Sequence, residues 1–419
     1  MTALKSLLSS GQRIFVHGQS AVPYRLIEEV VQCSSDLKDL EFIHLHVEGR
    51  PAHTLSEFSK KNRVNNLFVG PSLRDQMDYD RLDYTPLFLS EIPAFIKSGR
   101  CPIDIALVQV SPPDRFGYCT LGVSVDIARA AVDSAKVVLA QVNSNMPRTY
   151  GDSLIHVSKF RYVIETNNAL PEVGNSDIST DVIEKIGYHV ASLIEDGATL
   201  QLGIGAVPDA VLRCLNGHRH LGVHSELCSD GVVTLLESGV IDNSQKKVHA
   251  GKTIASFVQG TKKIYEFVNA NPSVELYPSD YVNSPAVIAR NPKVVAINSA
   301  VEIDLTGQVC ADSIGHHIIS GVGGQVDFVR GAAMSSGGKS IIAVTSRTKR
   351  GVPRIVPSLA LGAGVVTTRA DVHYVVTEFG IADLHGKTLR QRAQQLLSIA
   401  HPDDRDALSA AWRRIYDLR

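Results

Sequence analysis

The feature that most constrains the fold is a series of short, almost continuously apolar segments that alternate with helical segments. Ile103–Val110 and Lys136–Asn143 each have the pattern of a strand that is buried on both faces. Arg13–Gly18 reads as a strand that ends in glycine, and Tyr24–Cys33 as the helix that follows it. Asn66–Gly70 reads as a further strand. Strands that alternate with helices predict a parallel sheet covered by helices, so the predicted fold class is α/β.

The length of the chain predicts more than one domain. It has 419 residues, whereas a single hydrophobic core stops growing at about 250–300 residues. Within residues 145–180, two prolines and several asparagines and glycines interrupt any period, which is typical of a passage between domains. We therefore predict an N-terminal α/β domain over residues 1–176 and a C-terminal α/β domain over residues 177–419.

Two pairs of segments, one member of each in either half of the chain, are weakly similar, and each pair is called an echo. Ala135–Asn143 resembles Pro292–Asn298, and Arg161–Thr166 resembles His373–Glu378, in the same order along the chain. Either the domain has been duplicated or buried strands simply look alike, and the sequence leaves both explanations open.

Charge and cysteine usage exclude several classes of function. A net charge of −1 argues against a general role at nucleic acids or membrane surfaces. The six cysteines form no CxxC pair, which fits the reduced thiols of a cytosolic enzyme, and His316–His317 has no partner at metal-ligand spacing. No apolar run of membrane-spanning length is present, and the first residues lack the apolar core of a signal peptide. We expect a cytoplasmic protein without a metal site.

A glycine turn lies within Leu200–Asp209, where an apolar segment is followed by Gly203, Gly205 and then Pro208 near the start of a helix. A dinucleotide-binding fingerprint would place a third glycine where Pro208 stands, and it would use Glu226 as the ribose ligand. The turn also presents backbone N–H groups at a helix start, which suits a phosphate or an oxyanion. A tight turn that binds nothing is the alternative.

A carboxylate stands at the end of the next apolar segment. Leu221–Val223 leads into His224-Ser225-Glu226, and Ser229-Asp230-Gly231 follows as a turn. Because ligands bind at the carboxyl ends of strands in α/β sheets, we predict Glu226 as the catalytic nucleophile. Cys228 has no nearby base and is predicted to be a small buried residue instead.

A second glycine turn covers Gly321–Phe328. Its adjacent residues Gly323 and Gly324 let the backbone approach a ligand and direct N–H groups at it. Gly337-Gly338-Lys339-Ser340 resembles the end of a phosphate-binding loop, but a strand follows it rather than a helix, so that interpretation is rejected. Lys339 is kept as a candidate phosphate contact.

Six motifs, taken in order, carry a family resemblance. They are Ser111–Tyr118, Asn145–Asp152, Gly203–Pro208, His224–Gly231, Gly321–Phe328 and Thr377–Leu384. Over essentially the whole chain they resemble the acetyl-CoA hydrolase/transferase family, the class I coenzyme A transferases. The branch most similar is that of the 4-hydroxybutyrate and butyrate:acetate CoA-transferases. Taken without the resemblance, Ser111–Tyr118 is a rigid loop at a strand end, and either a pocket wall or simply a turn.

The resemblance implies two similar open, mostly parallel α/β domains with the active site at their interface. It implies that Glu226 forms a thioester with CoA, and that Gly323 and Gly324 serve the oxyanion and the thioester beside it. Asn283 stands where relatives place a polar site residue. The residues implied to lie along the CoA arm are Gly203, Ile204, Gly205, Ala206 and Val207.

The activity that the resemblance implies is a ping-pong transfer of CoA between a short-chain acyl-CoA, such as 4-hydroxybutyryl-CoA or butyryl-CoA, and acetate. The expected partners are the acyl-CoA and a short carboxylic acid. Coenzyme A is then a substrate, and no permanently bound cofactor or metal is required. A homodimer or higher homo-oligomer is expected. An acyl-CoA hydrolase that uses the same Glu226 is the alternative, and a nucleotide-binding oxidoreductase that uses Gly203 and Gly205 is a remote one.

Overall fold

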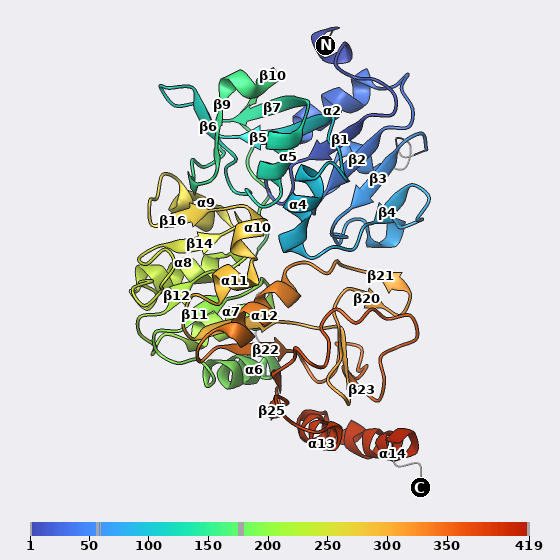
Figure 1. Cartoon of the computed structure of the whole chain (residues 1–419), viewed down its shortest axis with the longest axis vertical. Coiled ribbons are helices and arrows are strands. Elements are labelled where there is room, and N and C mark those ends of the chain that lie inside the picture. Colours follow the sequence, from blue (N-terminus) through green and yellow to red (C-terminus); the bar gives the residue numbers. More distant parts are fainter. Residues whose placement is uncertain (1, 56–57, 59, 175–179, 417–419) are drawn as a thin grey trace. The chain divides into compact units, whose positions relative to one another are not determined.

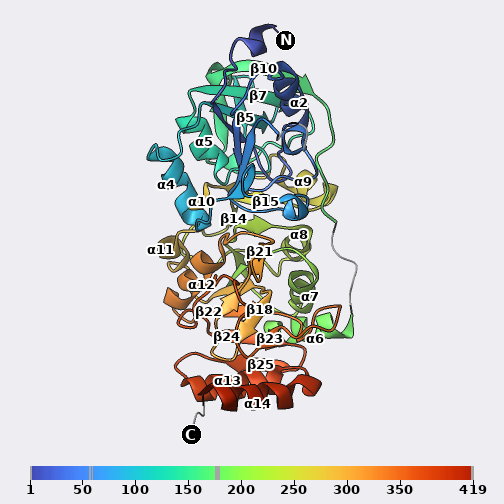
Figure 2. The same ribbon diagram turned by 90° about the vertical axis from the view of Figure 1, so that its right-hand side faces the viewer.

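The computed structural model describes residues 2–55, 58, 60–174 and 180–416 (Figures 1 and 2). The chain forms two compact units. Among the described residues, the first unit comprises residues 2–174 and Ile254–Val282, and the second comprises residues 180–253 and 283–416. The predicted domain boundary at residues 176 and 177 lies outside the described residues. The segment Ile254–Val282 therefore leaves the second half of the sequence to pack within the first unit.

The first unit is built on a seven-stranded sheet in the order β10-β7-β5-β1-β2-β3-β4, in which every neighbouring pair is parallel. Its strands are β1 (Arg13–Val16), β2 (Glu41–His44), β3 (Arg63–Asn66), β4 (Leu82–Tyr84), β5 (Ile105–Val110), β7 (Val137–Asn143) and β10 (Phe160–Thr166). Every residue of β5 is buried, as its apolar sequence predicts. Figure 2 shows α2 (Tyr24–Cys33) and α5 (Ala128–Ser134) on opposite sides of this sheet.

One predicted strand of this sheet is placed wrongly by the sequence. The apolar run Asn66–Gly70 is not a strand, because β3 ends at Asn66 and pairs with β2 and β4 through Arg63–Asn66. Leu67 and Val69 are buried after the strand has ended. The apolar run marks the place where the chain enters the core, whereas the more polar segment before it forms the hydrogen-bonded ladder.

Shorter elements complete the first unit. Its other helices are α1 (Thr2–Lys5), α4 (Ile92–Lys97), α9 (Lys262–Val268) and α10 (Ser279–Val282), with 3-10 turns η1 (Ala52–Thr54), η2 (Arg74–Gln76), η3 (Leu89–Glu91) and η4 (Val157–Lys159). Strands β6 (Tyr118–Thr120) and β9 (Leu154–His156) form an antiparallel pair. A small sheet joins β14 (Thr253–Ala255), β16 (Val274–Leu276) and β8 (Tyr150–Gly151), and β15 (Phe257–Val258) follows β14.

The second unit is built on a six-stranded sheet in the order β12-β11-β17-β22-β24-β25. Its strands are β11 (Thr199–Gln201), β12 (Gly222–Val223), β17 (Val294–Asn298), β22 (Lys339–Ala343), β24 (Tyr374–Thr377) and β25 (Gly380–Asp383). All neighbours are parallel except β24 and β25. The predicted fold class, mostly parallel α/β, is therefore confirmed in both units.

Helices accompany the sheet of the second unit. They are α6 (Asp181–Ala191), α7 (Ala206–Cys214), α8 (Asp230–Glu237), α11 (Pro285–Ile288), α12 (Gln325–Met334), α13 (Leu389–Ile399) and α14 (Arg405–Tyr416), with the 3-10 turn η5 (Pro402–Asp404) before α14. Thr388 caps α13 in a capping box with Gln391. The remaining strands are β13 (Leu227–Cys228), β18 (Glu302–Asp304), β19 (Val309–Cys310), β20 (Ser313–Ile314), β21 (His317–Ile318) and β23 (Ile355–Val356).

The two main sheets share one connection pattern. In the first unit the chain runs outward from β1 to β5, β7 and β10, with β2 on the other side of β1. In the second it runs from β11 to β17, β22 and β24, with β12 on the other side of β11. By position, β10 corresponds to β24, as the second echo indicates, whereas β7 corresponds to β22 and not to β17. The first echo therefore matches strands that are not equivalent, because both are buried central strands with the same apolar requirement.

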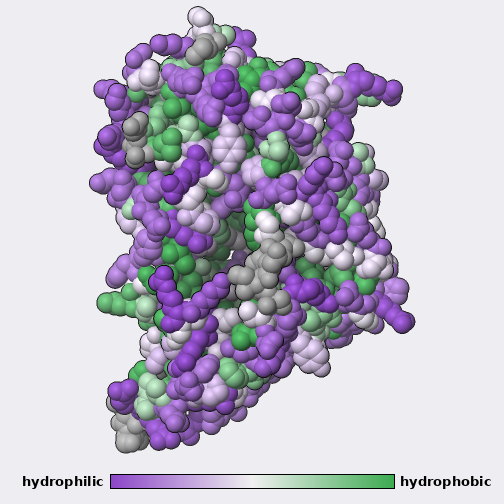
Figure 3. Space-filling view, turned by 180° about the vertical axis from the view of Figure 1, so that it is seen from behind, coloured by the Kyte–Doolittle hydropathy of each residue, from purple (hydrophilic) through white to green (hydrophobic). Residues whose placement is uncertain are grey.

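One face of the molecule shows the polarity of its surface. Hydrophilic side chains cover most of the face seen in Figure 3, with apolar residues between them. Among the described residues, no helix combines the length and the apolar character needed to cross a membrane.

Candidate active site

The first glycine turn of the second unit lies at the carboxyl ends of two central strands of its sheet. β11 and β17 are neighbours, and the chain leaves them toward opposite sides of the sheet, β11 toward β12 and β17 toward β22. This is a topological switch point, where open α/β sheets leave a crevice for a ligand. The first glycine turn follows β11, and Asn298 ends β17, with Ser299 directly after it. The fold therefore places the predicted turn where a ligand is expected.

A pocket of about 290 Å³ lies at this switch point. It is lined by the whole of Gly203–Pro208 and by Ile297, Asn298, Ser299 and Ala343. Gly205 has φ +112° and directly precedes α7, so the turn needs glycine there for its backbone conformation. A Cβ added at Gly203 or Gly205 would meet no atom within 4 Å apart from those of the adjoining residues. The space above both glycines is therefore open to a ligand.

Glu226 lies after β12, in the bend between β12 and β13, and its side chain is half-buried. The preceding residue anchors this bend to the first glycine turn. The Ser225 hydroxyl is buried, donates to the carbonyl of Leu202 at 3.0 Å and accepts from the N–H of Leu202 at 3.3 Å. These two bonds hold the loop that carries Glu226 against the residue that begins the turn.

Asn283 is a hydrogen-bond partner of the Glu226 carboxylate. Its amide Nδ2 donates to Oε2 of Glu226 at 2.9 Å, and its side chain is fully buried. An amide donor at this distance fixes the carboxylate in one orientation without adding a charge. The Asn283 carbonyl Oδ1 is buried without a hydrogen-bond partner among the described residues. This oxygen can therefore accept a hydrogen bond from a ligand or a water molecule.

The second glycine turn touches the same pair of side chains. Gly324 is the N-cap residue of α12, and a Cβ added to it would overlap both Oε2 of Glu226 and Nδ2 of Asn283. Gly323 has φ +58°, in the left-handed region that glycine adopts without strain. The unpaired N–H groups at the start of a helix carry partial positive charge, so the start of α12 favours negative charge at Glu226. Glu226, Asn283 and Gly324 thus form one contact cluster within the second unit.

Several site features lie outside what the sequence patterns indicated. Ser225 was part of a motif, but its bonds to Leu202 depend on the packing of two loops. Gln201 and Asn298 exchange amide hydrogen bonds at 3.0 and 3.5 Å across the ends of β11 and β17, beside the pocket. Polar amides at the ends of otherwise apolar strands were the signal that would have indicated this pair.

Two rival groups are placed in surroundings that do not suit catalysis. Burial, and then the charge of Asp230, raises the pKa of the Cys228 thiol to about 12, so the reactive thiolate is disfavoured. Lys339 was kept as a candidate phosphate contact, and that hypothesis is wrong. It begins β22, at the opposite end of the strand from Ala343 of the pocket, and its ammonium group contacts Glu195 at 2.9 Å and the carbonyl of Leu193 at 2.8 Å. The described residues contain no cluster of three or more potential metal ligands.

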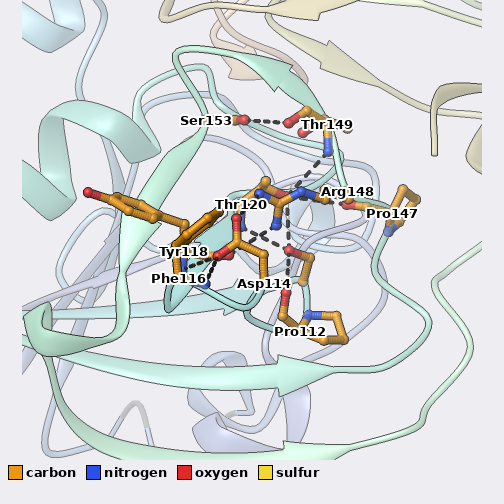
Figure 4. A network of polar contacts seen from close by, with 10 residues as sticks. Pro112, Asp114, Phe116, Tyr118, Thr120, Pro147, Arg148, Thr149 and Ser153 are labelled. Carbon is orange, nitrogen blue, oxygen red and sulfur yellow. Dashed lines mark hydrogen bonds and ion pairs between the residues drawn. The ribbon is translucent and has the colours of Figure 1, made fainter. Parts of the chain in front are cut away.

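Two further motifs form a network within the first unit (Figure 4). Asp114 accepts hydrogen bonds from the N–H groups of Phe116 and Tyr118, both at 2.9 Å, and pairs with Arg148 at 2.7 Å. Arg148 also donates to the carbonyl of Tyr118 at 3.0 Å. The bond from the Tyr118 N–H and, further, the Arg148 charge lower the pKa of the Asp114 carboxyl. This geometry stabilises the loop Ser111–Tyr118 as a turn, and a contact with a ligand there stays a prediction.

Comparison with known proteins gives the family. The model of the acetyl-CoA hydrolase/transferase N-terminal domain matches residues 2–173, and that of the C-terminal domain matches residues 260–412. A 4-hydroxybutyrate coenzyme A transferase of Clostridium kluyveri is 49% identical over 98% of this chain and 96% of its own length. A succinyl-CoA:acetate/propanoyl-CoA:succinate CoA transferase of Fasciola hepatica is 51% identical over 96% of this chain and 85% of its own length.

A solved structure agrees with these relatives. The 4-hydroxybutyrate CoA-transferase of Porphyromonas gingivalis superimposes with a TM-score of 0.85 at 40% identity, covering 99% of this chain and 96% of that one. The predicted enzyme class, a CoA-transferase, is confirmed by these relatives. Identity this high over nearly full length leaves one conclusion: the chain belongs to the acetyl-CoA hydrolase/transferase family.

Proposed function

We propose that this chain moves CoA between a short-chain acyl-CoA, of the 4-hydroxybutyryl or butyryl kind, and acetate, with Glu226 as the covalent nucleophile. The observation that carries the proposal is the contact cluster of Glu226, Asn283 and Gly324. It combines a carboxylate, one oriented amide donor and the start of a helix. These are the groups required for nucleophilic attack on an acyl carbonyl and for stabilising the oxyanion that forms.

The reaction begins with attack of the Glu226 carboxylate on the thioester carbonyl. The carbon–sulfur bond breaks, CoA leaves as a thiolate, and an acyl-glutamyl anhydride remains. The thiolate then attacks the glutamyl carbonyl and expels the first carboxylate, which leaves a glutamyl-CoA thioester. Acetate attacks that thioester in turn, and the same two steps in reverse release acetyl-CoA. Each intermediate stays activated, so the thioester energy is conserved.

The geometry of the second unit suits these steps. Each tetrahedral intermediate carries an oxyanion, and we assign the backbone N–H groups of Gly323 and Gly324 as its donors, because Gly324 lies against the Glu226 carboxylate. One such donor accelerates acyl transfer by about 10²–10³-fold. Asn283 keeps the carboxylate aimed, and the pocket above Gly203 and Gly205 offers open space along which we place the CoA arm.

The names of the relatives support a short acyl group. The Clostridium kluyveri relative is named for 4-hydroxybutyrate, and the Fasciola hepatica relative for succinyl, propanoyl and acetate groups. These acids share a short chain and a carboxylate, although their substituents differ. We therefore assign the class of substrate, a short carboxylic acid, with acetate as the acceptor.

Trapping the thioester tests the proposal. Butyryl-CoA is added without an acceptor acid, followed by borohydride, which reduces a thioester to an alcohol and leaves a free carboxylate unchanged. We expect loss of activity and conversion of Glu226 alone to its alcohol in a peptide mass map. Enzyme without butyryl-CoA is the control and should survive. Turnover without any acyl-CoA-dependent modification would rule out the covalent route.

A second measurement separates the transferase from a hydrolase on the same scaffold. Release of free CoA from butyryl-CoA is followed with and without acetate. A transferase forms acetyl-CoA and releases little free CoA, because water is excluded from the activated glutamyl group. Rapid CoA release that is independent of acetate would instead assign the hydrolase activity.

A further inference from the structure

Arg354 is a partly buried arginine in the segment that joins β22 to β24, directly before β23. Its backbone is fixed on both sides. The N–H donates to the carbonyl of Ser346 at 2.9 Å, and the carbonyl accepts from the N–H of Ile303 at 2.7 Å. These bonds hold the start of the Arg354 side chain in one place, so its guanidinium group reaches a fixed part of the second unit.

The guanidinium group of Arg354 is anchored beside the wall of the pocket at the switch point. Its Nη1 donates to the carbonyl of Ala300 at 2.9 Å and to that of Val301 at 3.0 Å. The residue before Ala300 is Ser299, which lines the pocket. Arg354 therefore brings a positive charge next to the segment that continues from the pocket wall.

No carboxylate neutralises this charge within the part of the chain that the structure describes. Burial lowers the pKa of the Arg354 guanidinium, and no neighbouring charge of the described residues opposes that effect. Arg347, earlier in the same segment, differs, because it pairs with Asp404 at 2.6 Å and with Asp403 at 3.4 Å. Since an arginine keeps its charge in a protein, Arg354 presents a cation that can attract an anion.

Two nitrogens of the Arg354 guanidinium make no hydrogen bond to the described residues. Nε is buried without a partner, and Nη2 takes part in neither of the bonds to Ala300 and Val301. Nε and Nη2 form one edge of the group, which suits two parallel hydrogen bonds to a carboxylate or a phosphate. A buried donor without a protein partner indicates that a ligand or a water molecule completes it. The charge and this edge together point to an anionic ligand.

Arg392 of α13 is anchored on carbonyl groups in a similar way but uses its Nε. Its Nη1 donates to the carbonyls of Thr306 and Arg369, and its Nε donates to the carbonyl of Lys387 at 3.3 Å. Arg392 also lies after β25, the last strand of the sheet, and not beside the segment after β17. It is therefore a matched control for Arg354.

We infer that Arg354 binds a phosphate group of the acyl-CoA substrate, beyond the pocket in which we place the CoA arm. The inference rests on the proposed function, in which Glu226 attacks the thioester. The sheet order β12-β11-β17 puts Glu226, after β12, two strand spacings from the segment that Arg354 holds after β17. Two spacings are about 10 Å. A reacting carboxylate must lie closer to Glu226 than that, whereas the phosphates of CoA lie far along the arm from its sulfur.

Substrate truncation tests the inference in the native protein. Butyryl-CoA and butyryl-pantetheine share the thioester, but pantetheine carries no phosphate. We expect kcat/KM to be higher for butyryl-CoA, and we expect KM for butyryl-CoA to rise with ionic strength, because salt screens the attraction between the two charges. Equal kcat/KM values for the two thioesters would overturn the inference without any variant.

Arg354→Met keeps the apolar stem of the side chain and removes its charge. It should lower kcat/KM for butyryl-CoA by about 10–100-fold, the range for hydrogen bonds to a charged group, and that for butyryl-pantetheine much less. Loss of the bonds to Ala300 and Val301 lowers both values alike, so the ratio between the two thioesters is the readout. Arg354→Lys keeps the charge without the fork and should give an intermediate ratio. Arg392→Met should lower the unfolding temperature and leave the ratio at its native value.

The possible failures of this experiment have different meanings. A native ratio in folded Arg354→Met would leave Arg354 with a structural role only and overturn the inference. A raised KM for acetate with a native ratio would overturn the phosphate assignment as well, and would give the arginine to a carboxylate. If Arg354→Met does not fold, Arg354→Lys and the truncation result in the native protein decide. A native protein that turns over neither thioester would instead contradict the proposed function.

Discussion

The amide nitrogen of Asn283 donates a hydrogen bond of 2.9 Å to Oε2 of Glu226, although 57 positions separate the two residues in the chain. The bond holds the carboxylate in a single direction, and Gly324 leaves just enough space for it. This relationship defines what each neighbouring residue contributes, and most of the tests below follow from it.

Replacing Glu226 by Gln should abolish transfer, because the amide keeps the size of the side chain but is a far weaker nucleophile than the carboxylate. Glu226→Asp should retain only a trace of activity, since withdrawal of the carboxylate by one methylene is a misplacement that costs about 10²-fold. Steady-state assays with butyryl-CoA and acetate measure both, and thermal unfolding checks that the fold is intact. Near-normal turnover in folded Glu226→Gln would move the nucleophile elsewhere, with Asp230, Asp327 and Glu378 as the next residues to test.

Replacing Asn283 by Asp separates the donor role of this residue from its size. Asp is close in shape to Asn but cannot donate when ionised, and it would place a second carboxylate beside Glu226. We expect kcat to fall by about 10²-fold or more, because like charges disfavour ionisation of the pair and the aim of the nucleophile is lost. The pH dependence of kcat should shift to higher pH in this variant, since Glu226 would then hold its proton longer. An unchanged pH profile would show that the bond between the two residues does not affect catalysis.

Alanine at each of the two glycines of the second turn should be harmful, but for different physical reasons. Gly324→Ala adds a methyl group that collides with Glu226 and Asn283, so kcat should fall sharply. Gly323→Ala places an alanine at φ +58°, which costs about 1–2 kcal/mol of stability. The free energy of unfolding and kcat are measured for both variants. If Gly324→Ala keeps normal kinetics, the second turn is only a structural element. The bulkier substitutions Gly324→Val and Gly323→Val should both lower kcat strongly.

The first glycine turn can be tested for ligand contact because Gly203 lies beside open space and is outside the left-handed region. Gly203→Ala should leave the unfolding temperature nearly unchanged, since its Cβ meets no protein atom within 4 Å. If the CoA arm passes over the turn, KM for the acyl-CoA should rise several-fold. Gly205→Ala is the matched comparison, and it should be less stable because Gly205 has φ +112°. Unchanged KM in Gly203→Ala would place the CoA arm elsewhere.

Ser225 should matter for stability and rate together. Ser225→Ala removes both hydrogen bonds to Leu202 and leaves buried backbone groups unpaired, a loss of about 1–3 kcal/mol. The loop that carries Glu226 is then less firmly held, so kcat should also decrease. Ser238→Ala, which removes a single bond to the carbonyl of Leu235 at the end of α8, is the control and should change stability only slightly. Equal effects on kcat in both variants would contradict a positioning role for Ser225.

The sequence predicted those features of the fold that depend on residues close together in the chain. Continuous apolar runs predicted β5 and β7 because a strand covered on both faces must be apolar at every position. The capping box of Thr388 and Gln391 at the start of α13 is a local feature of the same kind, because it depends on residues within one turn. The carboxylate Glu226 was singled out because it follows a strand, and its role as the nucleophile stays a prediction. All of these signals are local: period, cap and turn chemistry involve residues close together in the chain.

The contacts between residues that are far apart in the sequence could be seen only in the tertiary structure. The sequence alone did not show that Asn283 bonds to Glu226, that Gly324 leaves room for both, or that Ser225 ties the loop to Leu202, because each contact forms only when separate segments pack together. The same reason explains the wrong hypothesis for Lys339, which looks like a phosphate contact beside its glycines but begins its strand at the end remote from the pocket. Local patterns determine which elements form, whereas the order of strands in the sheet determines at which end of it each side chain lies.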